Sequence, residues 1–191
     1  MTVSSMEFQA LGLCGSPRRE GNTEILLRAG LDELEKLGTR VEFLRLSGYT
    51  INPCRSCREC LTLGICCIDD DMKNIIIPKL LQADIIIIAS PVYFNNVSSY
   101  VKLFMDRTWC IRGKLKDKIG GGIVVGGGRG LEQALSAIHS FMLKHGMILS
   151  HRGVSARGYD IGDVLEDKNA MKDVAGLAHR LYELAIVEKG R

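Results

Sequence analysis

An uninterrupted apolar run at residues 85–89 constrains the fold of this 191-residue chain more than any other feature. A strand that is apolar at every position must be covered on both faces, as the central strands of parallel sheets are. Residues 8–14 form a second short, nearly all-apolar run, which ends in a turn at Gly15-Ser16-Pro17. These two runs predict the interior of a parallel sheet.

Segments with helical periodicity alternate with the strand-like segments along the whole chain. The predicted strands are 8–14, 40–46, 85–89, 119–125 and 147–154. The first predicted helix begins at Asn22 or Thr23, and four more helices are predicted over 71–83, 98–112, 131–145 and 167–187. This alternation is typical of an α/β fold with a doubly wound, five-stranded parallel sheet, which we expect in the order 2-1-3-4-5. With no internal repeat and no linker, residues 1–191 are predicted to form a single domain.

Composition and charge exclude several classes of function. The net charge is only +3, and the basic residues are spread along the chain rather than gathered in the dense stripe that nucleic acid requires. No apolar run approaches the ~20 residues needed to span a bilayer. Residues 1–7 lack the pattern of a signal peptide. We therefore expect a soluble, cytoplasmic protein with no nucleic-acid or membrane partner.

The segment after the first predicted strand, residues 15–23, is a candidate phosphate loop. Ser16, Asn22 and Thr23 offer side-chain donors, the start of the helix offers free N–H groups, and Arg18 or Arg19 adds a cation. The segment has neither the GxGxxG fingerprint nor a Walker sequence. Taken alone, it is equally well explained as an ordinary turn followed by a helix cap.

Two further loops favour a ligand. Ser90-Pro91-Val92-Tyr93-Phe94-Asn95-Asn96 follows the third predicted strand, and Gly126-Gly127-Gly128-Arg129-Gly130 follows the fourth. Ligands of open α/β sheets bind beyond the carboxyl ends of the strands, where all three loops begin. Glycines allow the backbone to approach a flat ring closely, and aromatic side chains can stack on it.

These three segments, with Lys102 through Asp106-Arg107, resemble the NAD(P)H-dependent FMN reductase branch of the flavodoxin-like superfamily, from residue 8 to about residue 154. The resemblance implies a flavodoxin-like fold and a flavin-dependent oxidoreductase that binds FMN. The implied contacts of the phosphate are Ser16, Arg18, Gly21, Asn22 and Thr23. The implied neighbours of the flavin ring are Pro91, Val92, Tyr93, Phe94, Gly126, Gly127 and Gly128.

Five of the seven cysteines lie between Cys54 and Cys67, inside a connection (residues 47–70, the cysteine loop) much longer than the ~2–6 residues usual between a strand and a helix. Cys54, Cys57, Cys60 and Cys66 have the spacing C-x2-C-x2-C-x5-C. Three cysteines at this spacing can bind three corners of a [4Fe–4S] cluster and a fourth can close it, whereas zinc usually prefers two separated pairs. Cys14 and Cys110 are expected to be buried in the core.

The cysteine run also resembles the compact motif of the iron–sulfur flavoprotein family, in which the last cysteine precedes an acidic pair and a methionine, here Asp70-Asp71-Met72. The resemblance implies a [4Fe–4S] cluster held by Cys54, Cys57, Cys60 and Cys66 in a loop inserted after strand 2. Cys67, at x6 spacing, is the alternative fourth ligand. Zinc, or no metal, remains open.

We therefore predict an electron-transfer flavoprotein that relays electrons from a one-electron donor such as ferredoxin to an acceptor. The predicted strand order brings the loop ends to one edge of the sheet, so we expect cluster and flavin to lie close, within one subunit or across the interface of a homo-oligomer (dimer or tetramer). The alternatives are an NAD(P)H-dependent FMN or quinone reductase with metal-free or zinc-bound cysteines, and a redox sensor that works by cysteine oxidation.

Overall fold

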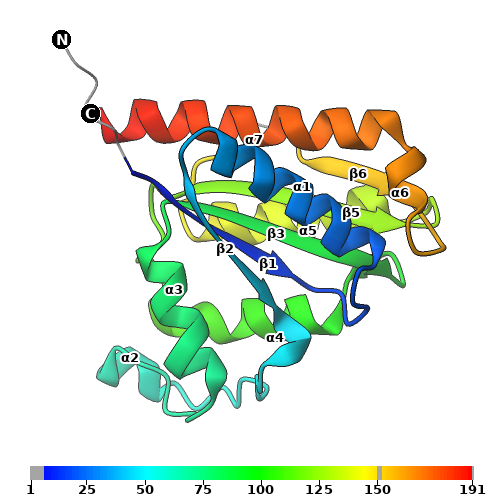
Figure 1. The fold of residues 1–191 in the computed structure, drawn as a ribbon. Coiled ribbons are helices and arrows are strands. Elements are labelled where there is room, and N and C mark those ends of the chain that lie inside the picture. Colours follow the sequence, from blue (N-terminus) through cyan, green and yellow to red (C-terminus); the bar gives the residue numbers. More distant parts are fainter. Residues whose placement is uncertain (1–6, 150–151, 191) are drawn as a thin grey trace.

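A parallel sheet of five strands, in the order β2-β1-β3-β5-β6, lies at the centre of the computed structural model, which describes residues 7–149 and 152–190 (Figure 1). The strands are β1 (Gln9–Cys14), β2 (Arg40–Arg45), β3 (Ile85–Tyr93), β5 (Ile119–Gly126) and β6 (Val154–Arg157). The two-residue β4 (Asn96–Val97) pairs antiparallel with the end of β3. The predicted fold class and strand order are confirmed.

Helices cover both faces of the sheet. One face carries α1 (Asn22–Lys36) and α7 (Lys168–Lys189), and the other carries α3 (Ile77–Gln82), α4 (Ser99–Arg107) and α5 (Leu131–Lys144) (Figure 1). The apolar run in β3 serves both layers. Its odd-numbered positions pack in the core beneath α1 and α7, and Ile86 and Ile88 pack in the opposite core. This division is why every position of the strand is apolar.

Short elements complete the chain. They are the 3₁₀ turns η1 (Leu46–Gly48) and η3 (Thr108–Ile111), the π-helical turn η2 (Met72–Ile76), and the helices α2 (Glu59–Leu63) and α6 (Asp163–Glu166). The helix predicted over 98–112 ends earlier, as α4, and continues as η3. Thr108 lies at this change, where its hydroxyl donates a hydrogen bond to the Met105 carbonyl at 2.7 Å.

The predicted position of the fifth strand is wrong. We expected it at 147–154, whereas β6 begins at Val154, and Ile148 forms an isolated parallel bridge with Ile119. Six positions separate Ile148 from Val154, but only four separate their partners Ile119 and Ile123 on β5. The edge strand therefore cannot pair continuously with β5. Residues 150–151, inside the predicted span, lie outside the described residues.

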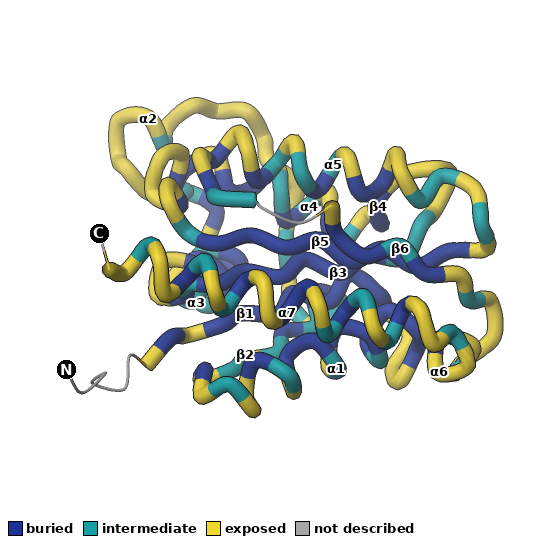
Figure 2. Tube along the Cα trace, turned by 90° about the horizontal axis from the view of Figure 1, so that it is seen from above, coloured by how far each residue is buried: buried dark blue, intermediate teal, exposed yellow. Residues whose placement is uncertain are grey.

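Figure 2 shows a buried sheet with an exposed segment around α2 projecting from one end of the molecule. This segment is the cysteine loop, which leaves β2 and returns to the fold at η2. Within residues 7–149 and 152–190, no helix is both long and apolar enough to cross a membrane. The prediction that no signal peptide is present concerns residues 1–7, and residues 1–6 lie outside the described part.

Candidate functional site

A cleft opens at the carboxyl ends of β1, β3, β5 and β6. It is lined by Ser16, Arg18, Gly21, Asn22, Thr23, Pro91, Val92, Tyr93, Val125, Gly126, Gly127, Gly158 and Tyr159. Ten of the twelve residues predicted to contact a cofactor are thus brought together, from three loops that are far apart in the sequence. This edge of an open parallel sheet is where ligands of such folds bind.

Phe94 and Gly128 are the two predicted cofactor residues that do not line the cleft. Phe94 and Asn95 form the turn between β3 and β4, with φ angles of 49° and 60°. Two consecutive left-handed residues are typical of a tight hairpin turn. The turn places the Phe94 side chain fully in solvent, at 104% relative exposure.

Val125, Gly158 and Tyr159 line the cleft but were not predicted. Gly158 and Tyr159 directly follow β6, so they lie at the same edge of the sheet as the other loops. The sequence analysis missed them because it ended the fifth strand at residue 154 and assigned no chemistry to residues 158–163. Placing that strand at Val154–Arg157 would have identified them.

The start of α1 faces the cleft without a side-chain cap. Gly21 is the N-cap residue, and it has no side chain with which to accept a hydrogen bond from the helix. Ser16 Oγ accepts from the Arg18 N–H at 3.2 Å, which folds the loop back towards the helix start. A helix N-terminus offers free N–H groups and a partial positive charge, so this arrangement suits an anion.

Asn22 ties the helix start to the loop after β6. Its side-chain amide donates to the Asp160 carbonyl at 2.7 Å, and its side-chain oxygen accepts from the Gly162 N–H at 2.9 Å. Arg18 donates to the Tyr159 carbonyl at 3.4 Å. The sequence analysis assigned the Asn22 side chain to a phosphate, whereas the structure also gives it a clear role in holding the opposite wall of the cleft.

A buried carboxylate fixes the candidate phosphate loop. Glu24 accepts from the Glu20 N–H at 2.7 Å and forms ion pairs with Arg45 at 2.6 Å and Arg28 at 2.8 Å. Burial raises the pKa of Glu24, but the hydrogen bonds from Arg45, Glu20 N and Arg28 outweigh this effect and lower the pKa below its usual value. The two arginines thus balance a negative charge that would otherwise repel an anion at the helix start.

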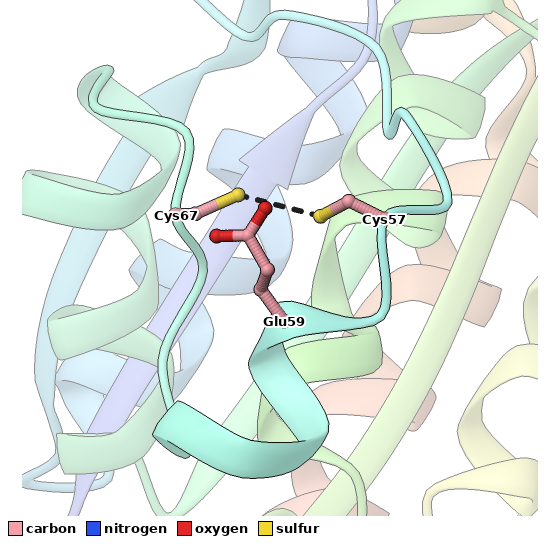
Figure 3. A group of neighbouring side chains, drawn as sticks. All are labelled: Cys57, Glu59 and Cys67. Atoms are coloured by element: carbon pink, nitrogen blue, oxygen red, sulfur yellow. Dashed lines mark hydrogen bonds between the residues drawn. The ribbon is translucent and has the colours of Figure 1, made fainter.

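The cysteine loop carries thiols in different surroundings. Cys54 and Cys57 are exposed and Cys60, Cys66 and Cys67 are partly buried, whereas Cys14 and Cys110 are buried as predicted. Among the described residues, the candidate ligand atoms found within 4.8 Å of one another belong to Cys57, Glu59 and Cys67 (Figure 3). The sulfur atoms of the four predicted ligands are therefore not gathered around one point.

Three of the predicted ligands nevertheless act electrostatically on the fourth, Cys60. Burial raises the pKa of Cys60, and negative charges on Cys66, Cys57 and Cys54 raise it further. The pKa of Cys67 is raised to about 11, first by its hydrogen bond with Cys57 and then by burial. Cys54, Cys57 and Cys66 thus lie near enough to Cys60 to affect its thiol, and Cys67 contacts Cys57 directly.

Arg107 joins the two ends of the cysteine loop to α4. Its guanidinium donates to both carboxylate oxygens of Asp70, at 2.5 and 3.0 Å, and to the Asn52 carbonyl at 2.6 Å. It also donates to Cys66 Sγ at 3.4 Å. The side chains of Arg107 and Asp70 are almost completely buried, at 0% and 1% exposure. The sequence analysis considered Arg107 only as one half of an Asp106-Arg107 pair and missed its contact with a predicted ligand.

Helix α4 lies between the cleft and the anchored end of the cysteine loop. Ser98, at its start, donates to the carbonyl of Gly15 in the candidate phosphate loop at 2.8 Å, while Arg107, at its end, contacts Cys66. Nine helical residues span roughly 13 Å. No residue of the described cysteine loop lines the cleft. The cysteine loop and the cleft were expected to lie close because they share one edge of the sheet, but within one chain they are not in direct contact.

Comparison with known proteins identifies the family. Residues 8–160 match the model of the NADPH-dependent FMN reductase family. The chain belongs to this family. It is 36% identical over 188 residues to the iron–sulfur flavoprotein MJ1083 of Methanocaldococcus jannaschii, covering 93% of this chain and 97% of that protein. It is 34% identical over 186 residues to the iron–sulfur flavoprotein of Methanosarcina thermophila, covering 94% and 97%.

Solved structures agree on the fold of this FMN reductase family member. RosB with a bound formylriboflavin phosphate intermediate has a TM-score of 0.81 at 17% identity, covering 96% of this chain and 81% of that one. The WrbA-like flavodoxin of Agrobacterium tumefaciens has a TM-score of 0.64 at 17% identity, covering 95% and 99%. The resemblance found in the sequence is confirmed: the chain is a flavin-dependent oxidoreductase related to the iron–sulfur flavoproteins, with a flavodoxin-like fold.

Proposed function

We propose that this protein relays electrons from a one-electron donor such as ferredoxin to an acceptor, using FMN in the cleft and a [4Fe–4S] cluster in the cysteine loop. The observation that carries the proposal is the set of four cysteines, Cys54, Cys57, Cys60 and Cys66, on one projecting loop of an FMN reductase fold. When bound, the cluster passes single electrons and the flavin stores two, so the pair converts between the two modes.

The residues of the cleft fit FMN. Ser16, Thr23 and the uncapped start of α1 offer donors to the phosphate, and Arg18 adds a positive charge. Gly126 and Gly127 present bare backbone where the flat ring would lie. A Cβ on Gly126 would come within 2.9 Å of Val92 Cβ, so a larger residue at that position would disturb the wall of the cleft.

The residues of the cysteine loop fit an iron–sulfur cluster in their chemistry. Thiolates are the usual protein ligands of such clusters. Arg107 supplies a charged hydrogen bond to Cys66 Sγ from a fully buried position, which orients that sulfur and offsets its negative charge. Asp70, the first residue of the acidic pair, in turn fixes Arg107, so this carboxylate holds the arginine that contacts Cys66.

Exposed apolar side chains support assembly and partner binding. Leu61, Leu63 and Ile65 of the cysteine loop are more than half exposed, and Phe94 is fully exposed. Apolar groups gathered on a projecting loop favour burial against another surface. We propose a homo-oligomer, a dimer or tetramer, in the reducing environment of the cytoplasm. Sedimentation of the protein with its cofactors tests the assembly, and a monomer at micromolar concentration would contradict it.

Cysteine variants prepared without oxygen test the cluster. We expect about four irons per wild-type chain and a broad visible absorbance that is lost on alanine substitution of Cys54, Cys57, Cys60 or Cys66. Alanine at Cys14, Cys67 or Cys110 provides matched controls that should keep the absorbance. Zinc in place of iron, or loss of absorbance in the Cys67 variant instead of the Cys66 variant, would refute this ligand set.

A second function has specific support. The chain is 30% identical over 178 residues to a putative NAD(P)H-dependent FMN-containing oxidoreductase of Bacillus subtilis, covering 87% of this chain. Anaerobic stopped-flow measurements with reduced ferredoxin and with NAD(P)H distinguish the two. We expect ferredoxin to be the faster donor and Cys57→Ala to abolish only its reaction. Fast flavin reduction by NAD(P)H that is unchanged in Cys57→Ala would favour the reductase.

A further inference from the structure

Two thiols of the cysteine loop face each other across its two arms. Cys57 lies on the arm that precedes α2, and Cys67 lies on the arm that follows it. Their sulfur atoms are 3.4 Å apart and share a hydrogen bond, and the two side chains point towards one another (Figure 3). A bond between these sulfurs would close the segment that contains α2 into a ring.

The backbone holds Cys57 in a bend. Ser56 and Arg58, on either side of it, have φ angles of 54° and 64°, which are left-handed values that non-glycine residues rarely adopt. Most side chains around this bend are exposed, so little packing prevents the arms from moving slightly closer. A disulfide requires about 2.05 Å between the sulfurs, so closing the present gap of 3.4 Å requires the two arms to move slightly closer together.

Neighbouring cysteines are directed elsewhere. Cys66 precedes Cys67 in the chain, but its sulfur contacts the buried guanidinium of Arg107 at 3.4 Å. Cys60 lies in α2 and packs against the core together with Cys66. Cys14 is buried in β1, and Cys110 is buried in η3, where its sulfur donates a hydrogen bond to the Arg107 carbonyl at 3.4 Å. Cys54 is exposed, and the contact between two sulfur atoms that the described residues show joins Cys57 to Cys67.

We propose that Cys57 and Cys67 form a disulfide when the loop carries no cluster, and that this bond prevents the loop from taking up iron. The bond itself depends only on the geometry of the two thiols. Its effect on iron uptake rests on the proposed function, in which Cys57 is a ligand and Cys67 is not. This assigns a role to Cys67, which is not among the four predicted cluster ligands.

The oxidant in this step is a small disulfide, such as oxidised glutathione. The sulfur of the exposed Cys57, as its thiolate, attacks one sulfur of the oxidant and releases one thiol, which leaves a mixed disulfide on Cys57. Cys67 then loses its proton, attacks the Cys57 sulfur and releases the second thiol. The protein loses two electrons to the oxidant, whose disulfide becomes two thiols. Excess small thiol reverses both exchanges.

Peptide mapping of the cluster-free chain tests the bond. The protein is incubated with oxidised glutathione, free thiols are alkylated, and the chain is digested with trypsin, which cuts after Arg55, Arg58 and Lys73. We expect the peptide 56–58 to be linked to the peptide 59–73, with fragmentation assigning the bond to Cys67. Bonds from Cys57 to Cys60 or Cys66, or an unlinked peptide 56–58, would overturn the proposal.

Iron uptake tests its consequence. After the same oxidation, wild-type protein should lose most of its capacity to take up iron and sulfide and should regain it on treatment with dithiothreitol, whereas Cys67→Ser should keep it throughout. Cys110→Ala is the matched control and should behave as wild type. Equal loss in Cys67→Ser would overturn the effect on uptake. A reduced wild-type chain that never takes up iron would instead refute the cluster, and the peptide map would still decide on the bond.

Discussion

Asp70→Asn removes one charge from the buried ion pair that anchors the cysteine loop. The Arg107 guanidinium would stay charged and buried without its countercharge, and the Asn52 carbonyl, the Cys66 sulfur and one amide oxygen would be its remaining acceptors. Removing one partner of a buried pair costs about 3–5 kcal/mol. For a domain of this size, 1 kcal/mol corresponds to about 2–4 °C in Tm, so we expect Tm to fall by roughly 6–20 °C.

The same helix provides a matched control. Lys102 and Asp106 form an ion pair at 2.6 Å whose side chains are about half exposed. Asp106→Asn should cost no more than about 0.5 kcal/mol, because an exposed pair is well solvated in both states. Combining Asp70→Leu with Arg107→Met removes both buried charges and should recover most of the stability lost in Asp70→Asn.

The stability difference should also depend on pH. Burial raises the pKa of Asp70, but hydrogen bonds from Arg107 and the Asn52 N–H outweigh it and lower the pKa below its usual value. The stabilisation is therefore fully present above the unfolded pKa of about 3.9 and is lost as pH falls through the folded value. Urea unfolding of wild type and Asp70→Asn at pH 7 and about pH 3 measures this. A difference below about 1 kcal/mol at pH 7, or one that grows on acidification, would refute the reasoning.

Three further predictions concern the cleft and the core. Arg18→Glu should weaken FMN binding about tenfold or more with little change in Tm, while Arg19→Glu, next to it but outside the cleft lining, should bind normally in a fluorescence titration. Gly158→Ala places a Cβ 2.6 Å from Asn22 Nδ2 and should weaken FMN binding, because the loop after β6 must move. Gly48→Ala, whose Cβ would have no neighbour within 4 Å, should leave FMN binding unchanged. Burial lowers the pKa of His145 in the folded protein. The free energy of unfolding of the wild type should therefore fall as the pH drops below the pKa of the unfolded state, about 6.5, and through the pKa of the folded state. Urea unfolding should show a weaker decline in His145→Gln.

Local patterns were sufficient to predict the sheet and most of the cleft. The apolar run in β3 reflects burial on both faces, and loops that follow parallel strands must meet at one edge. The loops that carry Pro91, Val92 and Gly126 were therefore expected at this edge, and the resemblance to the FMN reductases named these residues as neighbours of the flavin ring. The displaced fifth strand was not predictable in this way, because its register depends on how many residues bridge Ile148 and Val154 beside β5.

Long-range partners account for most of what the sequence analysis missed. Asn22 is bonded to a loop about 140 residues away, and Arg107 reaches Asp70 across 37 positions. Neither pairing leaves a periodic or spaced pattern in the chain. Phe94 was expected beside the flavin ring for its aromatic character, and its left-handed backbone, which the sequence does not reveal, turns its side chain to solvent. The pairing of Cys57 with Cys67 depends on the path of the loop rather than on the spacing of its cysteines.

The hydrogen bonds from Asn22 to the loop after β6 determine when, during synthesis of the chain, the cleft can be completed. The wall that Asn22 holds, residues 158–162, leaves the ribosome about 140 residues after Asn22 itself. Contacts between such distant residues form slowly, because a long loop must close before they are gained. A nascent chain therefore lacks a complete cleft until residues 158–162 have been synthesised, and a ligand that needs both walls can be captured only after that point.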